Sequence, residues 1–410
     1  MINRNYYLRT KQQNIFLIII IGFLDTITPF SIDMYLPAFP TIAKELHTTI
    51  GDVSLSVSTY FLGFALGQII YGPLLDRFGR KPPLYIGLLV YILSSLGCAA
   101  SPSIDALLLL RFMQALGGSV CSVAAMAMVR DFFPVEHSAR IYSLMILILG
   151  ISPLLAPTVG SLLVNVGSWH MIFIVLALIV ALVLVFTFFF LPEGHQPDPA
   201  ISLAPKHILA DFRSILLHPS FYIFSLAGTF SFAGLFVYVA GSPAIFMDEF
   251  HVNASTYGGI FALLSIGFIG GSQLNHLLTR KYSEESIFQA TLIVQVITGA
   301  LYFMGVINDW YGLTGNLVCL FVLLSCAGLT YPNAAAVALR PFSKNAGSAS
   351  ALLGFIQIGI GGMISSGIGM LHFKGSFSTS LIIVISSTIA LLILLAGRKK
   401  AGVANSAETI

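Results

Sequence analysis

Charged side chains are scarce in this sequence. Aspartate, glutamate, lysine and arginine make up only 9% of the 410 residues, and hydrophobic residues make up 57%. Soluble globular domains carry about 25% charged residues. The mean hydropathy of +0.91 points the same way. This balance excludes an ordinary soluble domain and predicts an integral membrane protein.

The sequence also lacks the patterns that would indicate an enzyme or a metalloprotein. Its nine histidines form no H-E-x-x-H motif, and no G-x-x-x-x-G-K-[ST] phosphate loop or hydrolase triad is present. The four cysteines lie in apolar runs without C-x-x-C spacing: Cys98, Cys121, Cys319 and Cys326. We therefore expect no enzymatic activity, no metal, nucleotide or covalent cofactor, and no nucleic-acid partner.

Apolar segments recur along the whole chain, each long enough to cross about 30 Å of hydrocarbon. Twelve can be counted, at residues 14–38, 50–75, 84–101, 106–130, 140–166, 170–191, 221–246, 255–279, 286–306, 312–339, 346–371 and 376–397. The longest connection is polar, rich in proline, and separates six spans from six. We expect an all-α membrane protein with twelve transmembrane helices, made of a six-helix half at 1–191, a cytoplasmic linker at 192–220, a six-helix half at 221–397 and a tail at 398–410.

Lysine and arginine are distributed unevenly between the two sides that these spans imply. Of the 20 basic residues, 17 fall in the terminal segments and in the connections on one side. The exceptions are Lys44, Lys374 and Arg111. Because basic residues gather on the cytoplasmic side, both termini are expected in the cytoplasm.

The connection between the second and third expected spans, residues 72–81, reads GPLLDRFGRK. It resembles G-x-L-x-D-R-x-G-R-K, the loop signature of the major facilitator superfamily, whose members have twelve helices. The resemblance implies a cytoplasmic gate in which Arg80 pairs with Asp131 and Asp76 faces the start of the eleventh span near Asn345. It also implies that Gly72 lets two helices approach closely. The implied gate residues are Gly72, Asp76, Arg77, Gly79, Arg80 and Asp131.

Two carboxylates, Asp25 and Asp33, lie in the first expected span. A charged residue there costs about 2.5–3.5 kcal/mol on insertion scales. Eight residues separate them, which corresponds to about 80° around a helix and about 12 Å along it. They can thus line one cavity at different depths, and Pro29 between them is expected to kink the helix. Burial favours the protonated form of a carboxylate and a nearby cation favours the ionised form, so either group could exchange a proton near neutral pH.

Arg111 is the only basic residue in the interior of an expected span, in the stretch LLLLRFMQALGG at 107–118. This stretch resembles the R-x-x-Q-G motif of the same superfamily, with Ala115 where glycine is usual. Because arginine stays charged, Arg111 needs an anion or water. Asp25 and Asp33 are the expected partners, and the spacing does not decide between them. These three residues form the predicted site of proton coupling and substrate binding.

The fifth expected span contains GISPLLAPTVG at residues 150–160. This resembles a motif found in the antiporters of the superfamily and largely absent from its symporters. Its small residues are expected to pack closely against the other half and its prolines to bend the helix. The motif residues are Gly150, Pro153, Pro157 and Gly160.

Several other segments resemble the Bcr/CflA branch of drug:proton antiporters. They are residues 31–37 (SIDMYLP), Trp169 with Ile172 and Phe173, and residues 191–193, 331–334 and 346–354. Asp25, eight residues before Asp33, is similar to an acid of the chloramphenicol and florfenicol exporters, in which it is thought to work with the arginine of span four. His170 departs from the arginine common after this tryptophan.

The resemblance implies a monomeric, proton-coupled multidrug exporter in the bacterial inner membrane, working by alternating access on lipophilic drugs such as amphenicols or bicyclomycin. The proton is its coupling ion, and its partners are the drug and the lipid bilayer. Aromatic and amide side chains in the spans are candidate drug contacts. They are Tyr35, Gln114, Tyr238, Tyr331, Asn333 and Gln357.

Three alternatives stay open at the level of sequence. The first is an exporter of narrow range, for amphenicols or an endogenous metabolite. The second is a proton-coupled importer of a nutrient, against which the antiporter motif weighs. The third is a membrane receptor or scaffold, which would need no pair of buried titratable groups.

Overall fold

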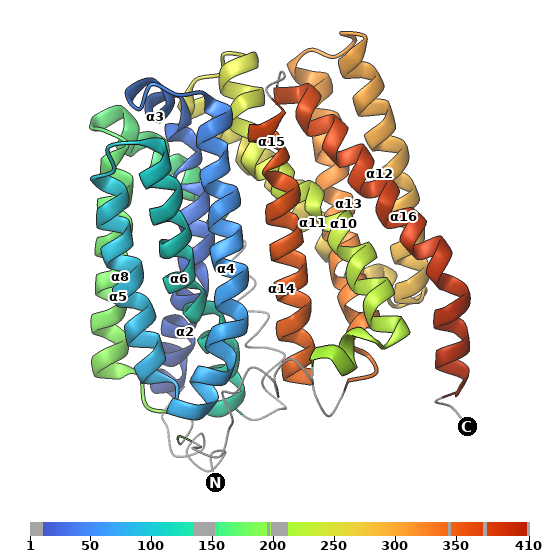
Figure 1. The fold of residues 1–410 in the computed structure, drawn as a ribbon, viewed down its shortest axis with the longest axis horizontal. Helices are drawn as coiled ribbons and strands as arrows, with labels where there is room; N and C mark the ends of the chain where they lie inside the picture. Colours follow the sequence, from blue (N-terminus) through green and yellow to red (C-terminus); the bar gives the residue numbers. More distant parts are fainter. Residues whose placement is uncertain are drawn as a thin grey trace. The chain divides into compact units, whose positions relative to one another are not determined.

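A computed structural model describes residues 11–133, 152–153, 155–194, 197, 212–342, 346–371 and 375–407. Every regular element within those ranges is a helix, which confirms the predicted all-α class for that part of the chain (Figure 1). The helices are α2 (Lys11–Asp33), α4 (Ile50–Phe78), α5 (Lys81–Ala99), α6 (Ile104–Phe132), α8 (His170–Phe190), α10 (Pro219–Pro243), α11 (Ala254–Leu278), α12 (Glu284–Ile307), α13 (Leu313–Leu339), α14 (Ala346–Ser365) and α16 (Gly375–Ala407). Short helices η1 (Leu36–Ala38), α3 (Phe39–Glu45), η2 (Ala244–Glu249) and α15 (Gly367–Met370) extend some of them.

Eleven helical segments in the described ranges are long and apolar enough to cross a membrane. Each agrees with one of the predicted spans to within a few residues, apart from the end of the first span. The predicted fifth span, 140–166, lies largely outside the described residues, and its described end forms the shorter apolar helix Leu155–Val166.

The first span is longer than predicted because helical structure continues beyond residue 38. After α2 the chain turns through η1 into α3, so that the whole segment ends at Glu45. Pro37 and Pro40 lie in the first turns of η1 and α3, where proline is compatible with a helix because the first amides have no intrahelical partner. The predicted end of the first span at residue 38 was therefore too early.

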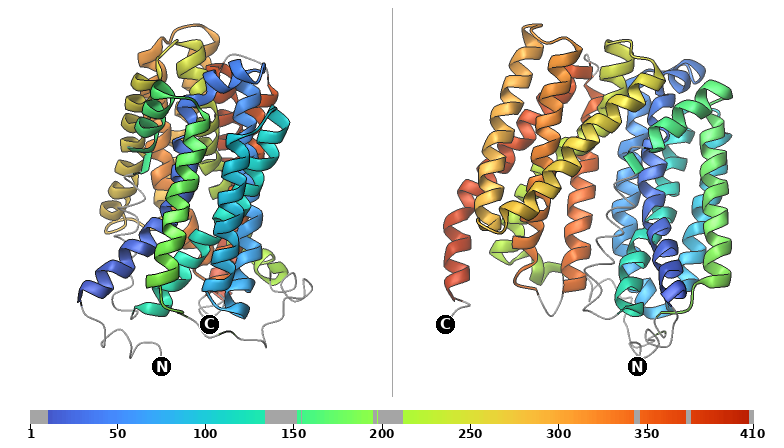
Figure 2. Two further views of the ribbon diagram at one scale, coloured as in Figure 1. Left: turned by 90° about the vertical axis from the view of Figure 1, so that its left-hand side faces the viewer. Right: turned by 180° about the vertical axis from the view of Figure 1, so that it is seen from behind.

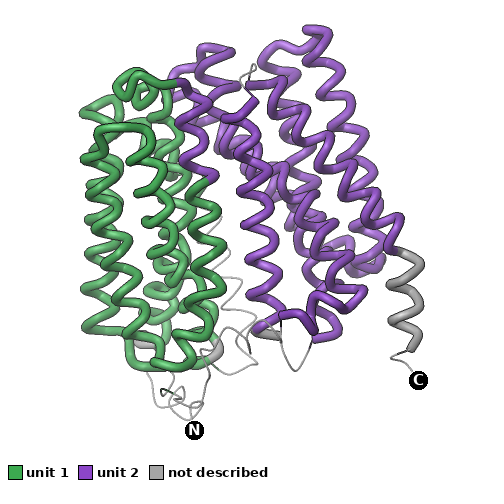
Figure 3. The backbone as a smooth tube through the Cα atoms, in the orientation of Figure 1, with its two compact units in different colours: residues 1–48, 59–203 green, residues 49–58, 204–410 purple. Residues whose placement is uncertain are grey.

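The chain divides into two compact units (Figure 3). Unit 1 consists of residues 1–48 and 59–203, and unit 2 of residues 49–58 and 204–410. The first turns of α4 thus belong to unit 2, where Ser58 Oγ lies 2.9 Å from Ser365 Oγ.

The helices pair in the same way within each unit. In unit 1, α2 and α5 each contact α6 and α8; in unit 2, α10 and α12 each contact α13 and α16. Figure 2 shows both sets from two further directions. Since α2 and α10 begin the two halves and α8 and α16 end them, the contacts match by position along the chain. This is the pattern expected of two related six-helix halves.

Glycine permits the closest of these helix crossings. A Cβ atom built at Gly117 of α6 would lie 2.7 Å from both the Gly87 carbonyl oxygen and the Tyr91 amide nitrogen of α5. Small residues let membrane helices approach to backbone contact in this way. The helices α5 and α6 of unit 1 are therefore closely packed along this crossing.

Candidate functional site

The two carboxylates of α2 are both buried, and they have different surroundings. Asp25 is 8% exposed, and its Oδ1 accepts a hydrogen bond of 2.8 Å from Ser122 Oγ of α6. Asp33 is 6% exposed, and no hydrogen bond or ion pair joins its carboxylate to another described residue. Asp25 is therefore anchored, whereas the Asp33 carboxylate is open to a new partner. The sequence analysis missed Ser122, because nothing in the sequence distinguishes it from Ser119 of the same helix until the helix pairing is known.

Arg111 of α6 is completely buried, and its neighbours differ from those expected. Its Nη1 donates a hydrogen bond of 2.6 Å to Gln114 Oε1, and Gln114 Nε2 donates one of 2.7 Å to Ser95 Oγ. Its guanidinium carbon lies 4.3 Å from the ring centre of Tyr60 and 4.7 Å from that of Tyr35. Cation–π attraction of this kind stabilises a desolvated arginine by about 2 kcal/mol.

The expected ion pair between Arg111 and an acid of span one is absent among the described residues. Neither Asp25 nor Asp33 lies within 4 Å of the guanidinium, and the Arg111 Nε and Nη2 groups have no hydrogen-bond partner there. Aromatic rings and one amide replace the carboxylate that the sequence predicted. Periodicity along one helix cannot show that Tyr35, which follows the end of α2, takes this place.

Tyr35 and Gln114, predicted as drug contacts, are fully buried within unit 1. Tyr35 packs against Phe39 and Phe173 with ring centres 5.0 and 5.3 Å apart. The rings of Tyr35, Tyr60 and Phe173 surround the Arg111 guanidinium, which also donates a hydrogen bond to Gln114. In this structure both residues predicted as drug contacts instead contact the Arg111 guanidinium.

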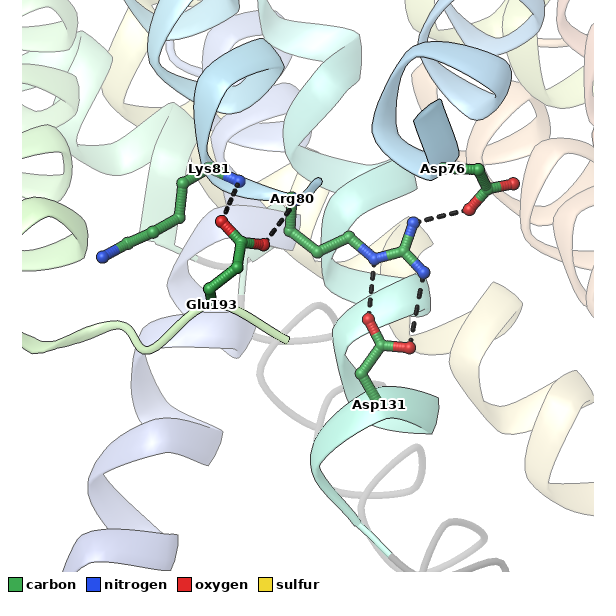
Figure 4. A network of polar contacts seen from close by, with 5 residues as sticks. All are labelled: Asp76, Arg80, Lys81, Asp131 and Glu193. Atoms are coloured by element: carbon green, nitrogen blue, oxygen red, sulfur yellow. Dashed lines mark hydrogen bonds and ion pairs between the residues drawn. The ribbon is translucent and has the colours of Figure 1, made fainter. Parts of the chain in front are cut away.

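The loop signature forms a compact ionic network (Figure 4). Arg80 Nε and Nη2 donate to the two oxygens of Asp131 at 2.6 and 3.3 Å, and Nη1 donates to Asp76 Oδ1 at 2.6 Å. The Arg80–Asp131 pair is the contact that the resemblance implied. Burial alone would lower the pKa of Arg80, but the hydrogen bonds and charges of Asp131 and Asp76 outweigh it and raise that pKa above its ordinary value.

Glu193 completes this network and was missed as a site residue. Its two carboxylate oxygens accept hydrogen bonds from the backbone amides of Arg80 and Lys81, at 2.6 and 3.3 Å. An anion at the start of α5 satisfies amides that have no intrahelical partner and complements the helix dipole. Glu193 lies 112 residues beyond Lys81, so only the folded chain brings it there.

The glycines of the signature have different roles. Gly79 has a φ angle of 86°, a left-handed conformation that favours glycine, and it reverses the chain between α4 and α5. A Cβ built at Gly72 would meet no atom within 4 Å among the described residues. The close helix approach expected at Gly72 is therefore not found there. Arg77 lies with its guanidinium carbon 5.7 Å from the Phe78 ring centre.

The described part of the antiporter motif packs inside unit 1. A Cβ built at Gly160 would overlap the carbonyl oxygen of Met34, the residue after Asp33. Gly160 therefore packs against the chain next to Asp33, and the packing expected against the other half stays a prediction. Pro153 and Pro157 lie in helical backbone, and Gly150 lies outside the described residues.

The four candidate drug contacts of unit 2 lie on three helices, α10, α13 and α14. Tyr238 packs on Phe261 with ring centres 5.5 Å apart, and Tyr331, 40% exposed, lies 4.7 Å from the Phe232 ring. Asn333 Nδ2 donates to Asn275 Oδ1 at 2.6 Å. Gln357 of α14 is buried.

A polar cluster that the sequence analysis did not identify lies between three helices of unit 2. Ser231 Oγ of α10 is 2.7 Å from Gln295 Oε1 of α12 and 2.9 Å from Thr330 Oγ1 of α13. Gln295 and Tyr238 also line a cavity of about 10 Å³, which has room for about one water molecule. The hydrogen bonds of this cluster connect α10 with α12 and α13, and the cavity beside it is too small to admit a drug.

No group of three histidine, cysteine or carboxylate side chains in the described part of the chain could hold a metal ion. Apart from the ionic network around Arg80, the buried polar groups of unit 1 include Arg111, Asp25, Asp33 and neutral donors. Such a set suits the binding of protons and of neutral or polar organic molecules.

Membrane-spanning helices in two units with matching contacts, and with acids and an arginine buried in them, are typical of a membrane transporter. Residues 21–366 match the Major Facilitator Superfamily, and the chain belongs to this family of transporters.

Several relatives match nearly the whole chain. It is 31% identical to "Uncharacterized MFS-type transporter YdgK" of Bacillus subtilis, over 88% of this chain and 90% of that one. It is 29% identical to the bicyclomycin resistance protein homolog of Haemophilus influenzae, over 87% and 89%. It is 25% identical to multidrug resistance protein D of Escherichia coli, over 93% and 95%. These relatives confirm the resemblance to the Bcr/CflA branch.

Solved structures share the fold at low sequence identity. A D-xylose–proton symporter matches with a TM-score of 0.69 and 15% identity, over 92% of this chain and 97% of that one. A peptide-bound transporter of the POT family matches with a TM-score of 0.71 and 13% identity, over 92% and 94%. At these identities the likeness concerns the fold alone.

Proposed function

We propose that this chain is a proton-coupled multidrug efflux antiporter of the bacterial inner membrane, which exports lipophilic drugs by alternating access. The observation that carries the proposal is the pair of buried acids on α2 in the same unit as an arginine that neither acid neutralises. The names of two relatives, a bicyclomycin resistance homolog and a multidrug resistance protein, support the substrate class.

Asp33 is the group that we assign to proton transfer. A buried carboxylate without a partner is stable as a neutral acid and becomes costly as an anion, so its proton can be exchanged for a favourable contact. In the proposed cycle a proton from outside neutralises Asp33 and the drug leaves. Release of the proton to the cytoplasm then restores the drug-binding state. Each proton brings about 2.3 kcal/mol for every 100 mV of membrane potential.

Asp25 and Arg111 are assigned to substrate handling. The Nε and Nη2 groups of Arg111, which have no hydrogen-bond partner among the described residues, can donate to a carbonyl, nitro or hydroxyl oxygen of a neutral drug. Buried donors left without a partner cost about 1–3 kcal/mol each, so a ligand that satisfies them gains affinity. Asp25, held by Ser122, keeps an acidic side in the same unit.

The decisive experiment measures drug-induced proton release from proteoliposomes that enclose a pH-sensitive dye, with chloramphenicol as the probe. Asp33→Asn is expected to abolish the release, because an amide cannot carry the proton. Asp105→Asn, which changes an exposed acid in the first turn of α6, serves as the matched control. Normal coupled efflux by Asp33→Asn would end the assignment of Asp33 as proton carrier.

Direction and range are tested on the same preparation and in cells. Proton and drug fluxes in opposite directions identify an antiporter, and parallel fluxes would identify a symporter. A growth-inhibition panel of unrelated drugs distinguishes a broad exporter from one restricted to amphenicols or to a metabolite.

A further inference from the structure

In unit 1, the end of the first span is fastened to the start of the sixth. Glu45 is the last residue of α3, and its Oε2 accepts a hydrogen bond of 2.7 Å from Trp169 Nε1, immediately before α8. Its Oε1 lies 3.5 Å from Nε2 of His170, the first residue of α8. Trp169 is completely buried, and a buried indole N–H needs an acceptor within the protein. Glu45 supplies that acceptor.

The same arrangement recurs in unit 2 with different chemistry. Glu249 is the last residue of η2, which continues α10. Its Oε2 accepts a hydrogen bond of 2.9 Å from the Ser376 amide, and its Oε1 accepts one of 2.7 Å from Ser376 Oγ. Ser376 is buried in the first turn of α16.

The two contacts occupy matching positions in the two halves. In each, the first helix is extended by a short helical segment that ends in glutamate, and this carboxylate binds the start of the sixth helix. The local sequences around Glu45 and Glu249 differ, as do the groups that they bind. The two contacts therefore agree in their position within the fold and not in their sequence.

In unit 1 this contact is connected to the buried arginine. Trp169 packs edge-on against Phe173 with ring centres 6.0 Å apart, and Phe173 lies 5.3 Å from Tyr35. Tyr35 and Phe173 both contact the Arg111 guanidinium, whose carbon is 4.7 and 5.8 Å from their ring centres. Each step is direct van der Waals or cation–π packing.

We propose that Glu45 is a positioning residue that fixes Phe173 and Tyr35 against Arg111 through its hydrogen bond to Trp169, and that Glu249 fastens unit 2 in the corresponding way. The effect expected on transport rests on the proposed function. The effect expected at Trp169 rests on geometry alone.

The sequence provides an optical reporter for the test. It has two tryptophans, Trp169 and the 66% exposed Trp310, so Trp310→Phe leaves Trp169 as the sole tryptophan. In that background Glu45→Ala removes the acceptor, whereas Glu45→Gln retains an oxygen that can accept from Nε1. Asp105→Ala, which alters an exposed acid in the first turn of α6, is the matched control.

Glu45→Ala is expected to shift Trp169 emission to longer wavelength and to raise its acrylamide quenching constant about twofold, because the start of α8 opens to water more often. Glu45→Gln and Asp105→Ala are expected to match the parent. Unchanged emission and quenching in Glu45→Ala would overturn the proposal.

The transport arm uses chloramphenicol-induced proton release in proteoliposomes. With Trp169 released in Glu45→Ala, the maximal rate is expected to fall about tenfold and Glu45→Gln to restore it, since the arginine loses its fixed geometry without losing its charge. A perturbed Trp169 with a normal maximal rate would overturn the positioning role. If the unmutated protein transports no drug, the proposed function fails, and the fluorescence arm still decides the Glu45 contact.

Discussion

At the scale of single residues, Ser122 is the side chain through which α6 reaches an acid of α2. Replacing it by alanine leaves Asp25 Oδ1 without the donor that the structure provides. A hydrogen bond to a charged group contributes about 1.5–3 kcal/mol, so Ser122→Ala is expected to slow drug-induced proton release by about tenfold or more. Ser122→Thr retains a hydroxyl and is expected to restore the rate. Equal rates for all three proteins would show that this bond does not matter for coupling.

Arg80 of unit 1 and Arg340 of unit 2 both form ion pairs with two acids, and the two arginines differ in burial. Arg80 is buried between Asp131 and Asp76, whereas Arg340, at the end of α13, is 51% exposed and pairs with Glu284 and Glu285. Breaking a buried pair costs about 3–5 kcal/mol, and an exposed pair contributes about 0–1 kcal/mol. In thermal unfolding in detergent, Arg80→Ala is expected to lower the midpoint clearly and Arg340→Ala hardly at all. A larger decrease of the midpoint in Arg340→Ala than in Arg80→Ala would contradict the conclusion that the Arg80 ion pairs contribute more to stability.

The residues of the loop signature could be predicted from sequence because they form one contiguous pattern. Arg80 and Asp131 pair as the resemblance implied. The partners of Arg111 could not be predicted, because three aromatic rings from three parts of the chain replace the expected carboxylate. Charge counting finds a buried cation, but it does not show that aromatic rings surround it.

At the scale of elements, the helix Leu155–Val166 approaches α2 at a glycine. Gly160→Ala would place a methyl group on the Met34 carbonyl oxygen, which cannot move without shifting the chain beside Asp33. Overpacking of this kind typically costs about 1–3 kcal/mol. We expect a lower thermal midpoint and impaired transport.

Gly72→Ala is the matched control for that substitution. Gly72 is also helical, and a Cβ there meets no atom within 4 Å in the described part of the chain. Glycine within a helix is less stable than alanine by about 0.5–1 kcal/mol, so Gly72→Ala is expected to be neutral or stabilising. If both variants behaved alike, the close approach at Gly160 would not explain the result.

Element positions could be predicted well because hydropathy alone sets the length of a membrane helix. The end of the first span could not, since Pro37 and Pro40 have the appearance of breakers and instead lie in the first turns of new helices. The close approach of Gly160 to Met34 could not be predicted either. A small residue shows that something comes near, and only the packing shows what it is.

At the scale of the whole molecule, the orientation in the membrane remains a prediction from the basic residues. In a variant with all four cysteines replaced by alanine, a single cysteine at Asp309 is expected to react with a membrane-impermeant maleimide added to intact cells. A single cysteine at Tyr282 is expected to react only after the membrane is opened. Labelling in the reverse order would invert the assigned topology.

A division into two compact units was predictable because a long polar connection interrupts the apolar spans, although residues 49–58 fall in the second unit. It was harder to predict that the two units repeat the same internal helix contacts, since this depends on which helix faces meet. Within unit 1, α2 contacts α6 and α8, and within unit 2, α10 contacts α13 and α16. Weak internal similarity in sequence does not specify such faces.

The position of Glu193 has a consequence for the peptide connection between the halves. This residue is the second of the predicted linker, and it is bound to the start of α5 through two backbone amides. The connection between the halves is therefore fixed to unit 1 at Glu193. Its length beyond this residue can be changed without breaking these two hydrogen bonds. Residues inserted well after Glu193 would lengthen the connection alone. Residues inserted before Glu193 would displace its carboxylate from the backbone amides of α5 and weaken the Arg80 network as well.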